Sequence, residues 1–278
     1  GNGNGNEIEN GTILKGTITS DVTLAAGNTY KLSGEYIVEE GATLHIEEGV
    51  KIIAVYDDIA DYILVKQGGK INAVGTPDKP IVMTSEKEEP GAWGGIHICG
   101  RAHTNAEGGK GSSEIGGAVY GGNDDADNSG TLQYIRLEYT GFAFDEEHEA
   151  NGISFYGVGN GTIVDHCQAY KGSDDGFEFF GGSVNVSNLV AVSCSDDSFD
   201  WTEGWNGKGT NLVAYQEDKS TLGYDCDCLM ECDNNGSNNA ATPVAHPVLK
   251  NLILVGNGGS KQGIRLRAGT EVEIDNAK

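Results

Sequence analysis

Basic residues are scarce in this sequence. Among 278 residues there are 18 Lys and Arg against 42 Asp and Glu, which gives a formal net charge of −24. A nucleic-acid-binding protein needs a basic face, and adhesion to an anionic membrane surface needs basic segments. No run approaches the roughly 18 apolar residues of a membrane-spanning helix. We therefore expect neither a nucleic-acid partner nor a transmembrane segment.

Cysteine is also too sparse for a disulfide scaffold, with six residues in the whole chain. Three of them form the only close group, Cys226, Cys228 and Cys232. A disulfide, free thiols and a zinc site with a fourth ligand are all compatible with that spacing, because connectivity cannot be read from sequence alone.

Glycine is abundant, at 43 residues, about twice its ordinary share. The opening GNGNGNEIENG has no hydrophobic periodicity and is typical of a flexible tether. We predict a tether and lead-in over residues 1–18 and one domain over residues 19–278. Loop insertions are expected near residues 101–130 and 216–250.

An internal repeat predicts the fold of that domain. The segment CQAYKGSDDGFEF, from Cys167, is followed 22 residues later by LVAVSCSDDSFDW, from Leu189. Further copies of the first strand begin at Ile135, Leu212 and Leu252. A second column of strands is predicted through Ile153, Phe177, Phe199, Leu229 and Ile264.

Short strands that recur about every 22 residues indicate a coil of parallel strands, whose neighbouring turns lie about 4.8 Å apart. Alternation within the strands turns Leu189, Ala191, Phe177 and Phe179 inward. No amphipathic helical pattern longer than ten residues is present. The predicted fold is all-β, a single-stranded right-handed parallel β-helix, in which each turn of the solenoid is stabilised mainly by its neighbours.

Four segments resemble motifs of a known family: PGAWGGIHICG (90–100), YGGNDDADNSGTLQYIRLEYTG (120–141), GSDDGFEFFGG (172–182) and SDDSFDWTEGW (195–205). The family comprises secreted β-helix proteins of Gram-negative bacteria, often surface lipoproteins, with a pectate-lyase-like (pectin-lyase-like) fold and no established activity. The resemblance implies an exported protein, extracellular or lipid-tethered at the outer-membrane surface.

The repeated acidic pairs are the first candidate site. A 22-residue offset stacks Asp174 on Asp196 and Asp175 on Asp197. Like charges about 4.8 Å apart repel by roughly 1 kcal/mol in water and by more near protein. Protonation, a divalent cation such as Ca²⁺, or hydrogen bonds from backbone N–H groups in the turns would relieve that repulsion. A calcium site and simple turn capping both remain open.

A second acidic loop contains Asp125 and Asp127 in the pattern D-x-D-x-S-G. This is the first half of a calcium-binding loop, but Arg136 stands where the loop would need its bidentate Glu. Calcium binding and a solvated acidic turn are the two interpretations of this segment.

Trp205 lies in the Gly-flanked loop 203–207, four residues after Trp201. An exposed indole beside acidic side chains suits the stacking of a sugar ring, and we place Glu178, Asp200 and Tyr215 with it as candidate ligand-binding residues. The alternative is that Trp205 folds back into the core.

These features predict a non-catalytic binding or adhesion module, for a polysaccharide or surface glycan, with Ca²⁺ as the candidate cofactor. A polysaccharide lyase or glycoside hydrolase that uses the stacked Asp residues is the alternative, since paired carboxyl groups serve as acid and base in glycosidases. The chain has no Gly-His-Gly segment like that of the polygalacturonases, so we predict no catalytic residues. A purely structural surface protein is the third possibility.

Overall fold

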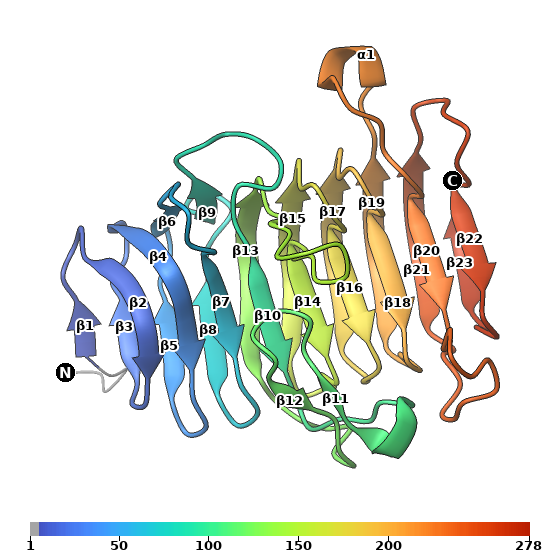
Figure 1. Cartoon of the computed structure of the whole chain (residues 1–278), viewed down its shortest axis with the longest axis horizontal. Coiled ribbons are helices and arrows are strands. Elements are labelled where there is room, and N and C mark those ends of the chain that lie inside the picture. The colour runs from blue at the N-terminus through green and yellow to red at the C-terminus, as the bar shows by residue number, and fades with distance from the viewer. Residues whose placement is uncertain (1–5) are drawn as a thin grey trace.

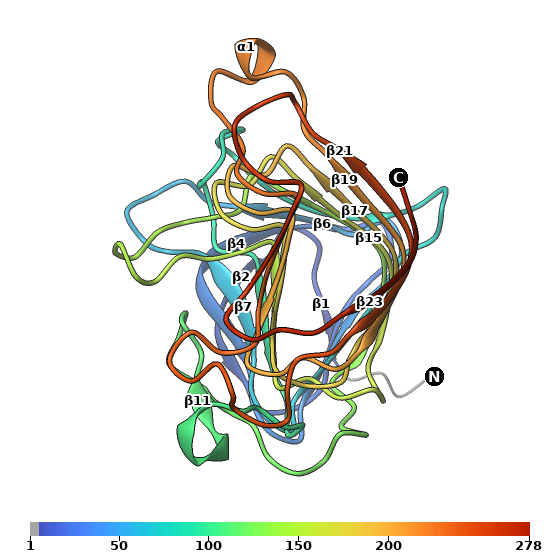
Figure 2. The ribbon, with the colours of Figure 1, turned by 90° about the vertical axis from the view of Figure 1, so that its right-hand side faces the viewer.

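The computed structural model describes residues 6–278 and contains a long coil of parallel strands (Figure 1). Seen along its axis, the coil encloses one continuous interior (Figure 2). Three parallel sheets run along it, as the predicted right-handed β-helix requires. The repeat thus identified the architecture correctly.

Sheet 1 is built from one strand, or the first half of a longer strand, of each turn. It contains β1 (Asn6–Ile8), β3 (Val22–Leu24), β5 (Thr43–Ile46), β8 (Lys70–Val74), the first halves of β13 (Gly130–Glu138), β15 (Ile163–Tyr170), β17 (Asn185–Val192), β19 (Lys208–Tyr215) and β21 (Val248–Val255), and then β23 (Glu273–Ala277).

Sheet 2 continues those long strands around the coil. It contains the first halves of β2 (Ile13–Ile18) and β4 (Thr29–Val38), then β6 (Lys51–Ala54), β9 (Ile81–Ser85) and the second halves of β13, β15, β17, β19 and β21.

Sheet 3 forms the remaining face. It contains the second halves of β2 and β4, then β7 (Tyr62–Val65), β10 (Ile96–Cys99), β14 (Ile153–Tyr156), β16 (Phe177–Phe180), β18 (Phe199–Thr202), β20 (Met230–Asp233) and β22 (Ile264–Arg267).

The predicted inward residues form the core. Leu189, Ala191, Phe177 and Phe179 are all at most 2% exposed. Like residues stack from turn to turn, and the rings of Phe177 and Phe199 lie parallel at 5.5 Å. The 22-residue repeat works because each inward side chain rests on its counterpart in the next turn.

A bend at one left-handed residue joins sheets 1 and 2 in each long strand. Asn188, Asn211, Asn251 and Asn276 all have φ between +54° and +61° at equivalent places. Asparagine tolerates this conformation better than most residues. Each of the last three donates a side-chain amide hydrogen bond to the Asn of the turn before, at 2.8–3.1 Å. We call this stack the asparagine ladder.

The coil begins earlier than the sequence predicted. β1 pairs with β3 and β2 pairs with β4, so residues 6–18 belong to the coil and are not a tether. Ile8 is the only apolar residue among the first eleven, which is why no hydrophobic periodicity is visible there. The rest of the predicted tether, residues 1–5, lies outside the described residues.

The first predicted insertion lies against the outer face of sheet 3. It contains a 3₁₀ turn, η1 (Glu107–Gly109), and the antiparallel pair β11 (Gly111–Ser112) and β12 (Val119–Tyr120). Its Ile115, Ala118 and Tyr120 form a second apolar cluster with Tyr156 and Phe180 of the sheet.

The second predicted insertion is divided in two. Helix α1 (Lys219–Leu222) lies in a first loop, β20 returns the chain to sheet 3, and a second loop leads to β21. Within residues 6–278 no helix has the length and hydropathy needed to cross a membrane.

Candidate functional site

Acidic side chains occupy equivalent positions on three consecutive turns, around β16, β18 and β20. Two residues come from the turn before each strand and one from the first outward position of the strand. We call the set the carboxylate grid: Asp174, Asp196 and Asp227; Asp175 and Asp197; and Glu178, Asp200 and Glu231. In the second row the third turn has Cys228 in place of an acid.

The grid has sharp ends along the coil. On the turn before it, Ala150, Asn151 and Ser154 take the three positions. On the turn after it, the chain has Lys261, Gln262 and Arg265. A neutral turn and a basic turn therefore flank three acidic ones.

The basic turn makes contacts with the grid. Arg267 forms ion pairs with Glu231 and with Asp233, the latter at 2.6 Å, and Lys261 lies 3.9 Å from Asp227. These contacts neutralise one edge of the grid and leave the first two turns without a basic partner among the ion pairs of the described residues.

Part of the grid caps the turns. Asn151 Oδ1 accepts a hydrogen bond from the Asp175 N–H at 3.2 Å, Asp175 Oδ1 accepts one from the Asp197 N–H at 3.0 Å, and Asp197 Oδ1 accepts one from the Cys228 N–H at 3.1 Å. Turn capping, the simpler of the two interpretations from sequence, thus accounts for Asp175 and Asp197. The structure gives the other six acids no such backbone donor.

Burial makes the grid costly to ionise. Asp174 is 7% exposed and Asp197 only 1%. Burial, followed by the neighbouring carboxylates, raises the pKa of Asp174 to about 11 and that of Asp197 to about 10. The same causes hold the pKa values of Asp175, Glu178 and Asp200 well above the ordinary range. Without a counter-cation, protons must therefore neutralise much of the grid at neutral pH.

The arrangement offers two kinds of chemistry. Carboxyl groups of Asp174 and Asp196, and of Asp197 and Glu231, lie within hydrogen-bonding reach, so each pair can share a proton. Several groups of three also place one oxygen each within 4.8 Å of one another, for example Asp174, Asp175 and Asp196. Oxygen-rich, irregular arrangements of this kind are the ones that Ca²⁺ accepts.

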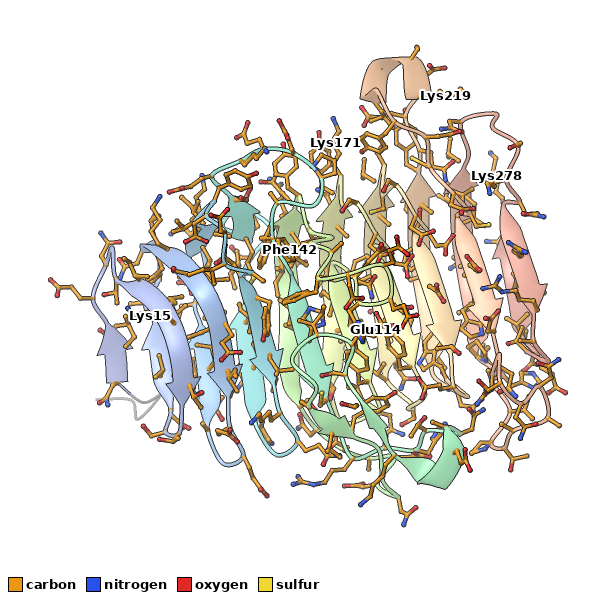
Figure 3. All side chains as sticks on the ribbon, in the orientation of Figure 1. Lys15, Glu114, Phe142, Lys171, Lys219 and Lys278 are labelled. Carbon is orange, nitrogen blue, oxygen red and sulfur yellow. The ribbon has the colours of Figure 1, made fainter. Side chains whose placement is uncertain are left out.

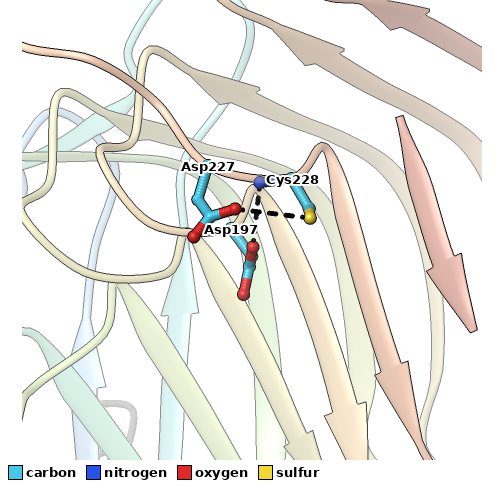
Figure 4. A group of neighbouring side chains, drawn as sticks. All are labelled: Asp197, Asp227 and Cys228. Carbon is cyan, nitrogen blue, oxygen red and sulfur yellow. Dashed lines mark hydrogen bonds between the residues drawn. The ribbon is translucent and has the colours of Figure 1, made fainter. Parts of the chain in front are cut away.

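Cys228 joins Asp197 and Asp227 in a further group of possible ligands (Figure 4). Its thiol donates to Asp227 Oδ1 at 3.4 Å, and burial raises the pKa of the thiol to about 12. A thiol held in its neutral form is a poor ligand, because the thiolate is the form that binds metals. The grid is therefore best suited to a hard cation bound through oxygen.

Two segments from outside the coil approach the grid. Glu114, from the first insertion, lies over the outer face of β14 and β16 (Figure 3). Its backbone N–H donates to the Tyr156 hydroxyl at 3.3 Å. Burial raises the pKa of Glu114 to about 7. Glu149 comes from the hairpin 142–150. Burial is the main cause of the raised pKa values of Asp174 and Asp196, and the charge of Glu149 adds to it. The insertion and the hairpin thus extend the acidic surroundings.

The structure brings together the predicted stacks and adds a third turn that the sequence did not reveal. Phe177 pairs with Phe199 and Glu178 with Asp200, as expected. The next partner of Phe199 is Met230, however, and not the predicted Leu229. A slip of one residue exchanges the two faces of a strand, so the predicted register did not place Glu231 on the outer face. The variable loop before β20 caused the slip.

Asp125 and Asp127 lie apart from the grid. Asp125 Oδ1 accepts hydrogen bonds from the backbone N–H and the Nδ1 of His103, at 3.0 and 2.8 Å. Asp127 accepts one from Ser129 Oγ at 3.1 Å. Neither residue belongs to a group of three converging ligand atoms in the described chain.

Trp205 corrects the expectation of an exposed sugar-stacking ring. It is 1% exposed, its ring stacks on Phe179 at 4.0 Å, and its indole N–H donates to Val184 O at 3.1 Å. The ring fills the core beside Trp201, so no face is free for a ligand.

Tyr215 is 43% exposed, but it lies on β19 in sheet 2, away from the grid on sheet 3. Glu178 and Asp200 are therefore the only two of the four predicted ligand-binding residues that the structure places in the grid.

All six cysteines are free and buried. Burial raises the pKa of Cys167 and Cys194 to about 12 each. The structure thus favours buried thiols over the disulfide and zinc alternatives for the cluster at 226–232.

Residues 16–278 match the family described as "Pectate-lyase like beta helix domain". Comparison with curated proteins gave no match. Among solved structures, the chain is similar to the Dettilon tailspike protein, with 9% identity and a TM-score of 0.26. That alignment covers 91% of this chain and 62% of the tailspike chain.

Proposed function

Since the chain belongs to the pectate-lyase-like β-helix family, we propose that it is an exported, cell-surface module that binds glycan without cleaving it and uses Ca²⁺. The observation that carries the proposal is the carboxylate grid with a basic turn at one edge. Eight acids on three turns need a neutralising partner, and a divalent cation supplies it at a pH where protons are scarce.

The surroundings of the grid indicate the class of glycan. A cation held by the grid would present positive charge beside Arg265, which lies next to Glu231 in the same outward row. Together they suit the carboxylate of an acidic sugar. Without the cation, the net charge of −24 would repel such a polysaccharide. Binding of acidic glycans should therefore depend on Ca²⁺.

An extracellular or outer-membrane location belongs to the same proposal. The motifs at 90–100, 120–141, 172–182 and 195–205 support it, because they resemble those of secreted and lipid-anchored β-helix proteins. Ca²⁺ in the surroundings of the cell would then keep the grid filled.

The test combines a thermal melt with a polysaccharide panel. Ca²⁺ should raise the melting temperature above that measured in EDTA, and acidic polysaccharides should retard the protein in an affinity gel only when Ca²⁺ is present. An unchanged melt together with equal mobility on every acidic polysaccharide would refute the proposal.

Cleavage is the second candidate, favoured by the carboxyl pairs Asp174–Asp196 and Asp197–Glu231. Such pairs can act as acid and base at a glycosidic bond. The same panel, read for new reducing ends and for the absorbance of unsaturated products, separates the two functions. If product forms and Asp196→Asn abolishes it, the function is cleavage of the polysaccharide and not binding alone.

A further inference from the structure

An open hollow lies on the same face of the molecule as the carboxylate grid, near the start of the coil. It has a volume of about 680 Å³ and lies between the bends of β2 and β4 and the hairpin 142–150. Side chains of Lys15, Ser33, Glu35, Ile59, Tyr62 and Phe144 line it. Figure 3 labels Lys15 on β2 and Phe142 at the base of the hairpin. We call this hollow the N-terminal groove.

The groove combines exposed apolar surface with fixed polar groups. Phe144 is 46% exposed and Ile59 is 57% exposed. Phe144 packs edge-on against Tyr62 at 6.0 Å and against Phe142 at 5.1 Å, which holds its ring in place. An exposed aromatic ring held by two others offers a preformed apolar face.

The polar side of the groove is also held in place. The Tyr62 hydroxyl donates to Glu35 Oε2 at 2.8 Å. The backbone N–H of Gly34 donates to Asp61 Oδ1 at 2.6 Å, and Asp61 is buried. These bonds fix the bend of β4 beneath the groove and orient the Glu35 carboxylate, which retains acceptor capacity for hydroxyl groups.

We infer that the N-terminal groove is a second glycan site, which takes a neutral saccharide and needs no cation. A sugar has apolar C–H faces that pack on a ring such as Phe144 and hydroxyls that bond carboxylate, hydroxyl and amine groups such as those of Glu35, Ser33 and Lys15. Ligand sites are commonly hollows of a few hundred Å³ with apolar walls and a few placed polar groups.

The charges in the groove select against an acidic sugar. Lys15 and Glu35 offset each other, and the buried Asp61 lies directly beneath. Burial raises the pKa of Asp61 to about 7, so the groove carries no net positive charge that would attract a carboxylate on the ligand. The groove therefore differs from the grid in the class of glycan that it suits.

One hairpin borders both sites. Phe144 of the hairpin 142–150 lines the groove. Glu149 of the same hairpin lies close enough to the grid for its charge to add to the effect of burial on the pKa of Asp174. Between β7 and β16 the coil advances by three turns, or about 14 Å at 4.8 Å each. A polysaccharide with neutral and acidic residues would reach both sites along one face.

The inference rests on the proposed glycan binding for its class of ligand, and its test separates the two. Affinity gels with hydroxyethyl cellulose, xyloglucan, galactomannan and dextran are run in EDTA, where the grid holds no cation. We expect at least one of these neutral polysaccharides to retard the protein. Phe144→Ala should weaken that retention roughly tenfold, which corresponds to ~1.4 kcal/mol. Ser33→Trp should fill the groove and give a similar loss.

Tyr215→Ala is the matched control, because Tyr215 is exposed to nearly the same extent as Phe144 but lies on sheet 2. It should leave the retention unchanged. Failure of all four neutral polysaccharides in EDTA would overturn the inference, and so would equal retention of wild type and Phe144→Ala. The calcium-dependent binding of acidic glycans is measured separately, so its outcome does not decide this one.

Discussion

Two stacks of side chains run along the same coil, and they differ in whether their members can satisfy one another's hydrogen bonds. On the bend between sheets 1 and 2, Asn188, Asn211, Asn251 and Asn276 stack at the spacing of the turns, and each amide donates to its neighbour. Before and on sheet 3, Asp and Glu stack at the same spacing, and each brings a donor only when it is protonated. The solenoid imposes the spacing on both.

The difference lies in the chemistry of the stacked group. An amide has a donor at one atom and an acceptor at the other, so a ladder of amides satisfies itself. An ionised carboxylate only accepts, so a ladder of carboxylates needs protons, N–H groups or a cation from elsewhere. The asparagine ladder is complete within the protein, whereas the ionised carboxylate grid is not.

The largest expected effect on stability comes from replacing an acid of the carboxylate grid by an amide like those of the asparagine ladder. Asp196→Asn removes a charge without changing shape, so it should raise the melting temperature in EDTA and abolish the gain on adding Ca²⁺. At 100 times the dissociation constant a ligand stabilises by about 2.7 kcal/mol. In a domain of this size that is roughly 5–10 °C. Differential scanning fluorimetry with and without Ca²⁺ measures both changes.

Asp125→Asn is the control for that experiment, because Asp125 was the competing calcium candidate and is paired with His103. It should keep the full calcium-dependent gain. If Asp125→Asn loses the calcium-dependent rise in melting temperature and Asp196→Asn keeps it, the cation site would be assigned to the loop at 123–130 instead.

Much of the fold was predictable because the coil repeats. Once CQAYKGSDDGFEF and its copy 22 residues later were aligned, strands, inward residues and the stacking of Asp174 on Asp196 followed, and the register confirms them. The same reasoning failed at Leu229 and Met230, where a loop of unequal length broke the repeat. Periodicity predicts a position only as far as the spacing holds.

Other features depend on contacts that no repeat encodes. Trp205 is buried because its ring stacks on Phe179 and its indole N–H donates to Val184 O. Neither contact is visible from the sequence around residue 205. The asparagine ladder is an exception that the repeat does encode, because Asn188, Asn211 and Asn251 each directly precede a leucine that begins a copy of the first strand. The N-terminal groove requires Phe144 to reach back across the face to Tyr62, a contact between residues 82 positions apart.

The second prediction concerns pH in the absence of divalent cations. Folding raises the pKa of Asp174 to about 11 and that of Asp197 to about 10, so the folded state keeps protons that the unfolded state loses above about pH 4. Stability from these groups is complete below that pH and is lost as pH rises toward the folded pKa values. In EDTA the melting temperature should fall between pH 5 and pH 9 by about 4 °C or more, which corresponds to a loss of ~2 kcal/mol in the free energy of unfolding.

The double variant Asp174→Asn with Asp197→Asn should weaken that dependence without abolishing it, because amides do not titrate whereas Asp175, Glu178 and Asp200 still do. The amide oxygen introduced by Asp197→Asn can still accept from the Cys228 N–H. Saturating Ca²⁺ should flatten it in the wild type as well. A melting temperature that rises steadily from pH 5 to pH 9 in EDTA would contradict the assignment of buried, protonated acids.

The smallest effect is expected from the reverse exchange, a carboxylate placed in the ladder. Asn211→Asp removes the amide donor to Asn188 Oδ1, now 3.0 Å away, and sets two acceptors against each other. The site is exposed, so the loss should be about 1 kcal/mol at pH 7. Below about pH 4 the carboxyl group regains a proton to donate, and the deficit should shrink. Chemical denaturation at pH 3.5 and pH 7 measures the change, with Thr210→Asp as a control that adds the same charge outside the ladder. Equal losses for both variants at pH 7 would mean that charge alone, and not the missing donor, sets the difference between ladder and grid.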